Sequence, residues 1–286
     1  MCEVFDFDRA GDRYRVAMGV EYCGTAYRGW QIQRSGVPTI QAELEAAASK
    51  VANEPVATIV AGRTDAGVHA TNQVVHFDTK SERTEYGWKM GINGRLPDDI
   101  SIRWVKMVDT HFHARFSAKE RAYRFIIHNS WVKSALLHNL TTWERYELDV
   151  NLMQQAADLL LGTHDFSSFR AAECQAHSPV RTLRELQIER FGEFVVLQAR
   201  ADGFLHHMVR NLVGVLLPIG RGRKPVEWAK EVLEYRDRTK GGVTAQGNGL
   251  YFVRAGYDRG DLPVMDAGPG FIQPLISNIT NKFSQV

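Results

Sequence analysis

The chain has 286 residues, of which 44% are hydrophobic, and its 35 lysines and arginines nearly balance 33 acidic residues. This length predicts one or two domains with a large core, and a formal net charge of +2 gives no global sign of a nucleic-acid-binding protein. Three widely spaced cysteines predict neither a disulfide framework nor a metal site. The acidic N-terminal region does not suit a targeting peptide, and no apolar run is long enough to span a membrane. A cytoplasmic protein is therefore expected.

The first half of the chain alternates predicted strands with predicted helices. Strands are expected over residues 13–21, 57–60, 73–77 and 100–108. One helix begins at Thr39, an N-cap residue, and a second covers residues 84–94. The core face of the first helix consists of Ile40, Leu44, Ala47, Ala48 and Val51. This order of elements is typical of an α+β fold.

Two glycine-containing loops stand out in this half, at residues 22–31 and 61–70. Glycines on both sides of Asp65 permit positive φ and close approach of another backbone, so we expect Asp65 on a tight loop that a large ligand reaches. The alternative is a hairpin turn in which Asp65 makes an Asx-type hydrogen bond. The first loop places aromatic residues beside arginines, which suits base stacking or, equally, the filling of a core edge.

The second half adds a basic segment and further helices. In residues 113–125 one acid accompanies four basic residues, and a strand there would put Lys119, Arg121 and Tyr123 on one side. Such a face suits a phosphate backbone with a flipped base, and the alternative is a solvated edge strand. The elements expected further on are a helix over 149–161 with Leu152, Ala156, Leu159 and Leu160 inward, strands over 182–188 and 194–201, helices over 204–217 and 225–235, and a loop and strand within 244–253.

Basic residues at two places in this half suggest function. Arg210 lies in the nearly continuous apolar surface of the helix over 204–217, and an arginine is rarely buried without a partner. We hypothesise that Arg210 pairs with Asp65 of the other half; the alternative is snorkelling to solvent. Arg221, Arg223 and Lys224 are interpreted as a phosphate-contact loop or else as a solvated basic turn.

Five segments together resemble motifs of the tRNA pseudouridine synthase A family, in that family's order and spacing. They are residues 22–31, 61–70, 115–123, 206–211 and 249–251. The resemblance extends over roughly residues 14 to 263, most of the chain. Two positions depart from the family pattern: Cys23 replaces an acidic residue, and Gln246 stands where proline is frequent.

The resemblance implies the pseudouridine synthase fold, α+β with two similar halves, a central antiparallel sheet and a cleft between the halves. The domains expected are residues 1–114, which carry the Asp65 loop, and 115–262, which carry basic RNA-binding elements; residues 263–286 form a tail of uncertain structure. The expected activity is isomerisation of uridine to pseudouridine at positions 38–40 of the tRNA anticodon stem-loop. The resemblance also implies a homodimer that uses no cofactor and no metal.

The same resemblance assigns roles to single residues. Asp65 is implied to be the nucleophile, oriented by Arg210. Tyr123 is implied to stack on the target base and to assist removal of its C5 proton. Arg63 would fill the space that the flipped base leaves or hold its phosphate, and Leu250 would form a pocket wall.

Two other functional classes are compatible with parts of the pattern. A non-catalytic module that binds structured RNA would use the same basic segments without needing Asp65. A carboxylate-based glycosidase usually needs a second acid as proton donor. No second carboxylate lies in a comparable loop of this sequence, which counts against the glycosidase.

Overall fold

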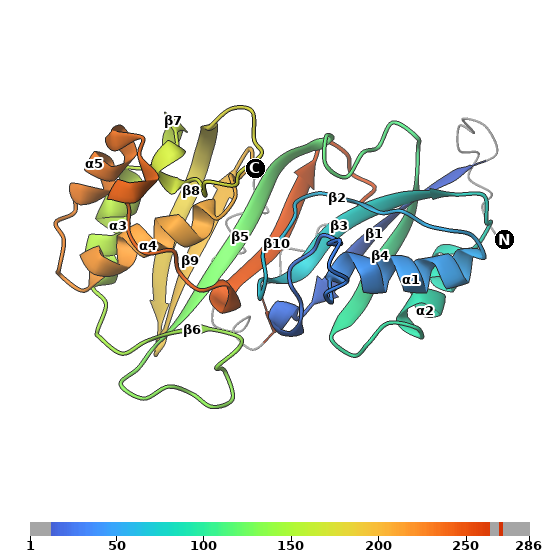
Figure 1. Ribbon diagram of the computed structural model, residues 1–286, viewed down its shortest axis with the longest axis horizontal. Helices are drawn as coiled ribbons and strands as arrows, with labels where there is room; N and C mark the ends of the chain where they lie inside the picture. Colours follow the sequence, from blue (N-terminus) through green and yellow to red (C-terminus); the bar gives the residue numbers. More distant parts are fainter. Residues whose placement is uncertain (1–12, 264–268, 271–286) are drawn as a thin grey trace. The chain divides into compact units, whose positions relative to one another are not determined.

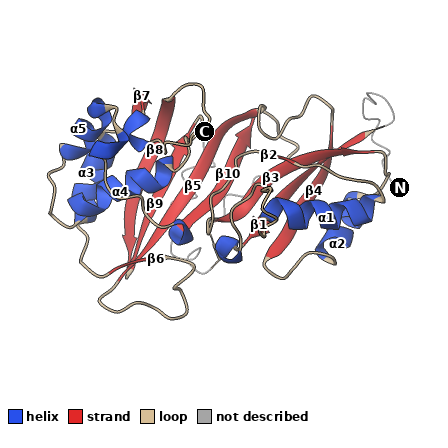
Figure 2. Ribbon diagram, in the orientation of Figure 1, coloured by secondary structure: helices blue, strands red, loops and turns tan. Residues whose placement is uncertain are grey.

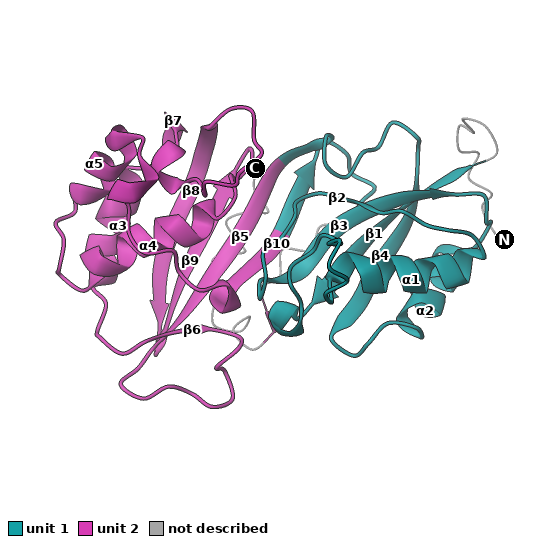
Figure 3. Ribbon diagram, in the orientation of Figure 1, with its two compact units in different colours: residues 1–119, 254–266 teal, residues 120–253, 267–286 magenta. Residues whose placement is uncertain are grey.

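The computed structural model of the protein describes residues 13–263 and 269–270 (Figure 1). Within these residues the chain forms ten β-strands and five α-helices, which confirms the predicted α+β class. It divides into two compact units (Figure 3): unit 1 contains residues 1–119 and 254–266, and unit 2 contains 120–253 and 267–286. Most of the predicted tail, 263–286, lies outside the described residues.

Unit 1 is an antiparallel sheet with two helices. Its strands are β1 (Tyr14–Tyr22), β2 (Ile59–Val60), β3 (His69–Thr79) and β4 (Ile100–Val108). β1 lies between β3 and β4 and is buried along most of its length, as expected for a central strand. β2 pairs antiparallel with β3, so the chain reverses direction in the segment 61–68 that connects the two strands.

Both helices of unit 1 begin close to their predicted starts. The side chain of Thr39 accepts a hydrogen bond from Ala42 N at the start of α1 (Ile40–Ala52). Thr84 caps α2 (Glu85–Asn93) in the same way through Gly87 N. The two helices contact each other and α2 packs on β4 (Figure 2), and the predicted core face of α1 is buried except for the half-buried Val51.

Unit 2 contains the remaining elements. Its strands are β5 (Ala118–Asn129), β6 (Thr142–Glu144), β7 (Gly162–Asp165), β8 (Val180–Phe191), β9 (Phe194–Ala201) and β10 (Leu250–Tyr257), and its helices are α3 (Val150–Asp158), α4 (Met208–Gly220) and α5 (Trp228–Tyr235). The strand order is β10-β5-β9-β8-β7, with antiparallel pairing along β5-β9-β8-β7. β5 and β10 each carry residues of both units.

Several predictions about unit 2 are wrong in detail. α4 begins at Met208, four residues after the predicted start, because His207 has φ 62°, which is not a helical conformation. α3 ends at Asp158, and its buried residues are Met153, Ala156 and Ala157. Of the predicted inward residues, Ala156 and Leu160 are buried, Leu152 is half-buried, and Leu159, beyond the end of the helix, is exposed. α5 begins at Trp228 and not at residue 225.

The predicted basic strand is present as β5, but it lies between β10 and β9, so the alternative of an edge strand is wrong. Arg124 in β5 is fully buried, and its Nε donates a hydrogen bond to Gln198 Oε1 at 2.7 Å. Arg121 donates to the Asp202 carbonyl, so both arginines have local partners in unit 2. Among the helices of the described residues, none combines the length and apolar character that crossing a membrane requires.

Candidate active site

The loop that carries Asp65 joins β2 to β3 within unit 1. Its base is closed by a hydrogen bond from Ala61 N to the Val74 carbonyl (2.8 Å) and by the side chain of Gln73, which donates to the Gly62 carbonyl (2.7 Å). At its tip Gly67 has φ 75°, a left-handed conformation that favours glycine, and Val68 N donates to the Asp65 carbonyl. The tight turn that the glycines predict is therefore present, with Asp65 half-buried on it.

Residues 22–31 hold this loop from outside. Trp30 N donates to the Thr64 carbonyl (3.0 Å), and the hydroxyls of Tyr22 and Thr64 are 2.8 Å apart. Gly29 has φ 93°, and a Cβ on it would lie 2.8 Å from the Thr64 carbonyl oxygen. A side chain at residue 29 would therefore push against the main chain next to Asp65, so glycine is required here for the close approach.

The aromatic side chains of residues 22–31 belong to the core of unit 1. Tyr22, Tyr27 and Trp30 are all buried, which favours the core alternative over base stacking. Burial raises the pKa of Tyr22 to about 12, so its hydroxyl stays protonated and available to Thr64. Their contribution is to fix the backbone that presents Asp65.

Cys23 occupies the position where the family pattern has an acidic residue. A hydrogen bond from the His69 side chain lowers the pKa of the Cys23 thiol to about 7, and Thr25 contributes in the same direction. Cys23 is not disulfide-bonded. A substantial fraction of thiolate at neutral pH would place negative charge at this position despite the substitution.

Two of the predicted substrate-contact residues lie in the sheet of unit 2. Tyr123 is in β5, is 8% exposed, and has its ring in edge contact with Phe204 (5.0 Å between centroids) and Phe252 (5.2 Å). These contacts fix the ring plane. Leu250 is the first residue of β10 and is also buried.

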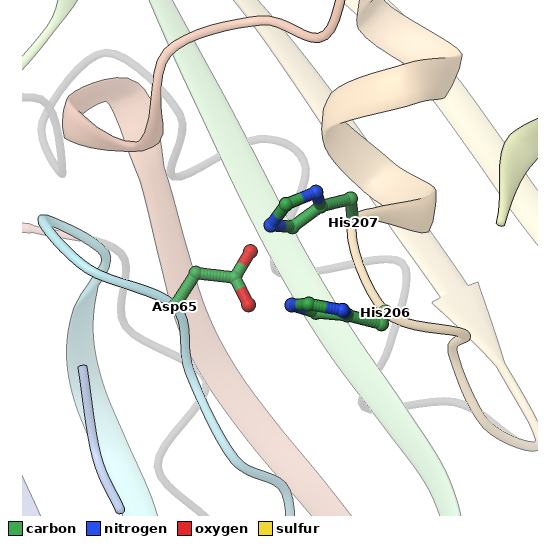
Figure 4. A group of neighbouring side chains, drawn as sticks. All are labelled: Asp65, His206 and His207. Carbon is green, nitrogen blue, oxygen red and sulfur yellow. The ribbon is translucent and has the colours of Figure 1, made fainter. Parts of the chain in front are cut away.

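The third residue of α4 is Arg210, which is half-buried. Its Nε donates to the Ala245 carbonyl at 2.7 Å, and Ala245 N donates to the Arg210 carbonyl at 3.2 Å. Directly before α4, the rings of His206 and His207 are 4.0 Å apart (Figure 4, which also shows Asp65 on its loop). No role for these histidines follows from the residue pattern alone, although two adjacent histidines stand before the most apolar segment of the helix.

The predicted basic loop has local partners in unit 2. Arg221 forms an ion pair with Glu144, whose side chain is only 5% exposed. The Arg223 guanidinium lies 4.9 Å from the Tyr146 ring centroid, and the Lys224 ammonium lies 5.0 Å from that of Trp228. The charge of Arg221 is thus compensated by Glu144. Arg223 and Lys224 are exposed, so their positive charges are the ones available for the predicted phosphate contacts.

The structure thus places the predicted site residues in two groups. Arg63, which is exposed, and Asp65 share one loop of unit 1. Tyr123, Arg210 and Leu250 belong to unit 2. The Asp65–Arg210 pair would join the two units and stays a prediction, as does the absence of metal and cofactor.

Comparison with known proteins gives a consistent result over most of the chain. The tRNA pseudouridine synthase family matches residues 18–117 and 156–258. A tRNA pseudouridine synthase A of Pseudomonas aeruginosa is 54% identical over 262 residues, 91% of this chain and 92% of its own length. Proteins of the same name from Pseudoalteromonas atlantica and Shewanella piezotolerans are 51% and 49% identical, each over 90% of this chain and 98% and 99% of their own lengths.

Proposed function

Because this chain belongs to the tRNA pseudouridine synthase family, we propose that it isomerises uridine at positions 38–40 of the tRNA anticodon stem-loop, with the Asp65 carboxylate as the nucleophile. Such enzymes convert uridine in tRNA to pseudouridine. The bond between C1′ and N1 breaks, the uracil turns, C1′ bonds to C5, and the C5 proton leaves while N1 gains one. The atoms balance without an oxidant, a reductant or added water.

The observation that carries this proposal is the way the Asp65 loop is held. Its main chain is fixed on both sides of Asp65, by Trp30 N at Thr64 and by Gly67 at the turn, while the neighbouring Ala66 adds little bulk. A carboxylate held in this manner is a competent nucleophile and stabilises positive charge that develops at a sugar carbon. This holds whether its target is C1′, C6 of the base, or the proton on C2′.

The other residues act on the same nucleotide. Tyr123 stacks on the flipped uracil with a ring whose plane Phe204 and Phe252 fix, and its hydroxyl assists removal of the C5 proton. Leu250 forms an apolar wall, and Arg210 supplies positive charge. Arg63, exposed beside Asp65, occupies the space that the flipped base leaves or holds its phosphate.

Binding of tRNA is expected to depend on phosphate contacts, to which the exposed Arg223 and Lys224 contribute. The affinity should therefore fall as salt is raised. A cytoplasmic homodimer is part of the same proposal, in line with the family to which the chain belongs.

The test uses tRNA transcripts in which uridine is present at only one of positions 38, 39 and 40. Each transcript is incubated with the protein alone, modified with carbodiimide and mapped by primer extension. The proposal expects a pseudouridine stop at each of the three positions, and none with Asp65→Asn although that variant binds tRNA. A stop outside these positions only, or full activity of Asp65→Asn, would contradict it.

A further inference from the structure

The guanidinium of Arg210 is held by a short segment, residues 242–246, that runs along the first turns of α4. The two backbone-linked hydrogen bonds between Arg210 and Ala245 form a reciprocal pair, one through Nε and one through the Arg210 carbonyl. A planar guanidinium whose Nε is bonded to a main-chain carbonyl has its plane fixed. The orientation of Arg210 therefore depends on where this segment lies.

Three side chains hold the segment through one partly buried hydrogen-bond network. The Thr244 hydroxyl donates to Asn211 Oδ1 at 2.7 Å, and Arg238 Nη2 donates to both Asn211 Oδ1 (3.0 Å) and Thr244 Oγ1 (2.8 Å). Asn211 is 2% exposed, and its Nδ2 donates to the Phe169 carbonyl (2.8 Å). All polar atoms of the Asn211 amide thus have partners, which makes the network costly to disturb.

The backbone of the segment also fits closely against α4. A Cβ on Gly214 would lie 2.0 Å from the Val243 carbonyl oxygen, and a Cβ on Gly242 would lie 2.1 Å from the Gly214 carbonyl oxygen. Two glycines therefore allow main chain to pack on main chain, one turn of helix beyond Arg210. The segment has little room to shift while its side-chain network is intact.

We propose that Asn211, Thr244 and Arg238 are positioning residues for Arg210 in pseudouridine formation, acting through the carbonyl of Ala245. This inference rests on the role of Arg210 in the proposed function. None of the three needs to touch the RNA. Their loss lets the segment and the Arg210 guanidinium move, and a displacement of about 1 Å at a reacting group is enough to cost up to about a hundredfold in rate.

The same segment continues through the turn Gly247–Gly249 into Leu250, the proposed pocket wall. Gly249 is packed so closely that a Cβ would lie 2.6 Å from the Ile126 carbonyl oxygen of β5. This second anchor holds the Leu250 end independently of Thr244. Loss of the Thr244 hydroxyl should therefore affect Arg210 more than it affects the wall.

The experiment measures single-turnover pseudouridine formation and tRNA affinity separately. Thr244→Val removes the hydroxyl with little change in volume; we expect the rate constant to fall about tenfold or more while the dissociation constant for tRNA stays within about twofold. Thr244→Ser, which restores the hydroxyl, should regain most of the rate. Thr163→Val is the matched control, since it removes a hydroxyl bonded to Thr182 at the β7–β8 edge, and it should leave the rate unchanged.

A double-mutant comparison with Arg210→Met separates this inference from the proposed function. If Thr244 acts through Arg210, Thr244→Val causes no further loss in the Arg210→Met background. Wild-type rate in Arg210→Met would contradict the proposed role of Arg210 itself. A slow Arg210→Met with an unaffected Thr244→Val, or equal losses from Thr244→Val in both backgrounds, would overturn the positioning role alone. Should Thr244→Val not fold, Arg238→Met, which removes both hydrogen bonds of Arg238 Nη2, replaces it with the same expectations.

Discussion

The Asp65 loop in unit 1 and the Arg210 site in unit 2 are held in place by different means. Around Asp65 the restraints are mostly main-chain hydrogen bonds and glycines, with Gly29 and Gly67 both at positive φ, and the side chains of Tyr22 and Gln73 add two further hydrogen bonds. Around Arg210 the main chain of residues 242–246 also packs closely on α4, but here a network of three side chains, Asn211, Thr244 and Arg238, is added. A site held by its main chain responds sharply to added bulk, whereas one held by side chains responds in steps as single hydrogen bonds are removed.

Among changes to these restraints, the largest effect should come from breaking the main-chain contact in unit 1. Gly29→Ala adds a Cβ against the Thr64 carbonyl and should lower the single-turnover rate by about a hundredfold or more, about 3 kcal/mol in barrier. Gly36→Ala is the control, because Gly36 also has positive φ but has nothing within 4 Å of its Cβ position. Equal losses in both variants would show that backbone strain alone, and not the contact with Thr64, is responsible.

A side-chain restraint in unit 2 should give the next largest effect, on stability. Arg221→Met leaves the buried Glu144 carboxylate without its ion pair and should lower the free energy of unfolding by about 2 kcal/mol. Arg223→Met, which removes an exposed cation over Tyr146, should change stability little but weaken tRNA binding. Urea titration and binding measured by fluorescence anisotropy test this contrast, which would fail if Arg221→Met weakened binding without loss of stability.

A side-chain hydrogen bond made by His76 in unit 1 should respond to pH. His76 accepts a hydrogen bond from Ala114 N, and burial, with Arg15 and His113 nearby, lowers its pKa to about 4. The folded state therefore binds this proton at a lower pH than the unfolded state. The contribution of neutral His76 to the free energy of unfolding is full above pH ~6.5 and falls as the pH drops toward 4. Between pH 7.5 and 5.5 the loss should be about 1 kcal/mol from this group. His76→Asn should remove that part of the slope in urea titrations, and an unchanged slope would contradict it.

The smallest effect concerns Cys23 at the edge of the Asp65 loop. Because its pKa is lowered to about 7, its rate of alkylation by iodoacetamide should reach half of its maximum near pH 7. Peptide mapping by mass spectrometry distinguishes this residue from the other two cysteines. His69→Gln should move the midpoint upward, since the His69 hydrogen bond is the largest cause of the shift. A midpoint near that of an ordinary thiol in the wild-type protein would refute the interaction.

The same contrast explains how much of the fold and site was predictable. The Asp65 loop was predictable because the glycines and flanking strands that determine it are close to it in the sequence. The helix cap at Thr39 was predictable for the same reason. The support of Arg210 was not, because Arg238 and Thr244 lie 28 and 34 residues away and join Asn211 only in the folded unit.

Arg124 and the start of α4 show two other limits. The basic residues of β5 predict side chains that face solvent or RNA, but Arg124 is buried and bonded to Gln198 of the neighbouring strand β9. The apolar run that begins at Phe204 extends the helical pattern past the real start of α4, because the left-handed conformation of His207 is not encoded in hydrophobic spacing. Tertiary partners and single backbone angles decide these cases.

The most direct test of the central claim is the single-turnover rate of Asp65→Asn with enzyme in excess over tRNA. Asparagine keeps the size of the side chain and its place on the loop but removes the negative charge. We expect tRNA binding within about twofold of wild type and a rate of pseudouridine formation at least about a thousandfold lower. A rate within about tenfold of wild type, with binding intact, would show that the Asp65 carboxylate is not the nucleophile.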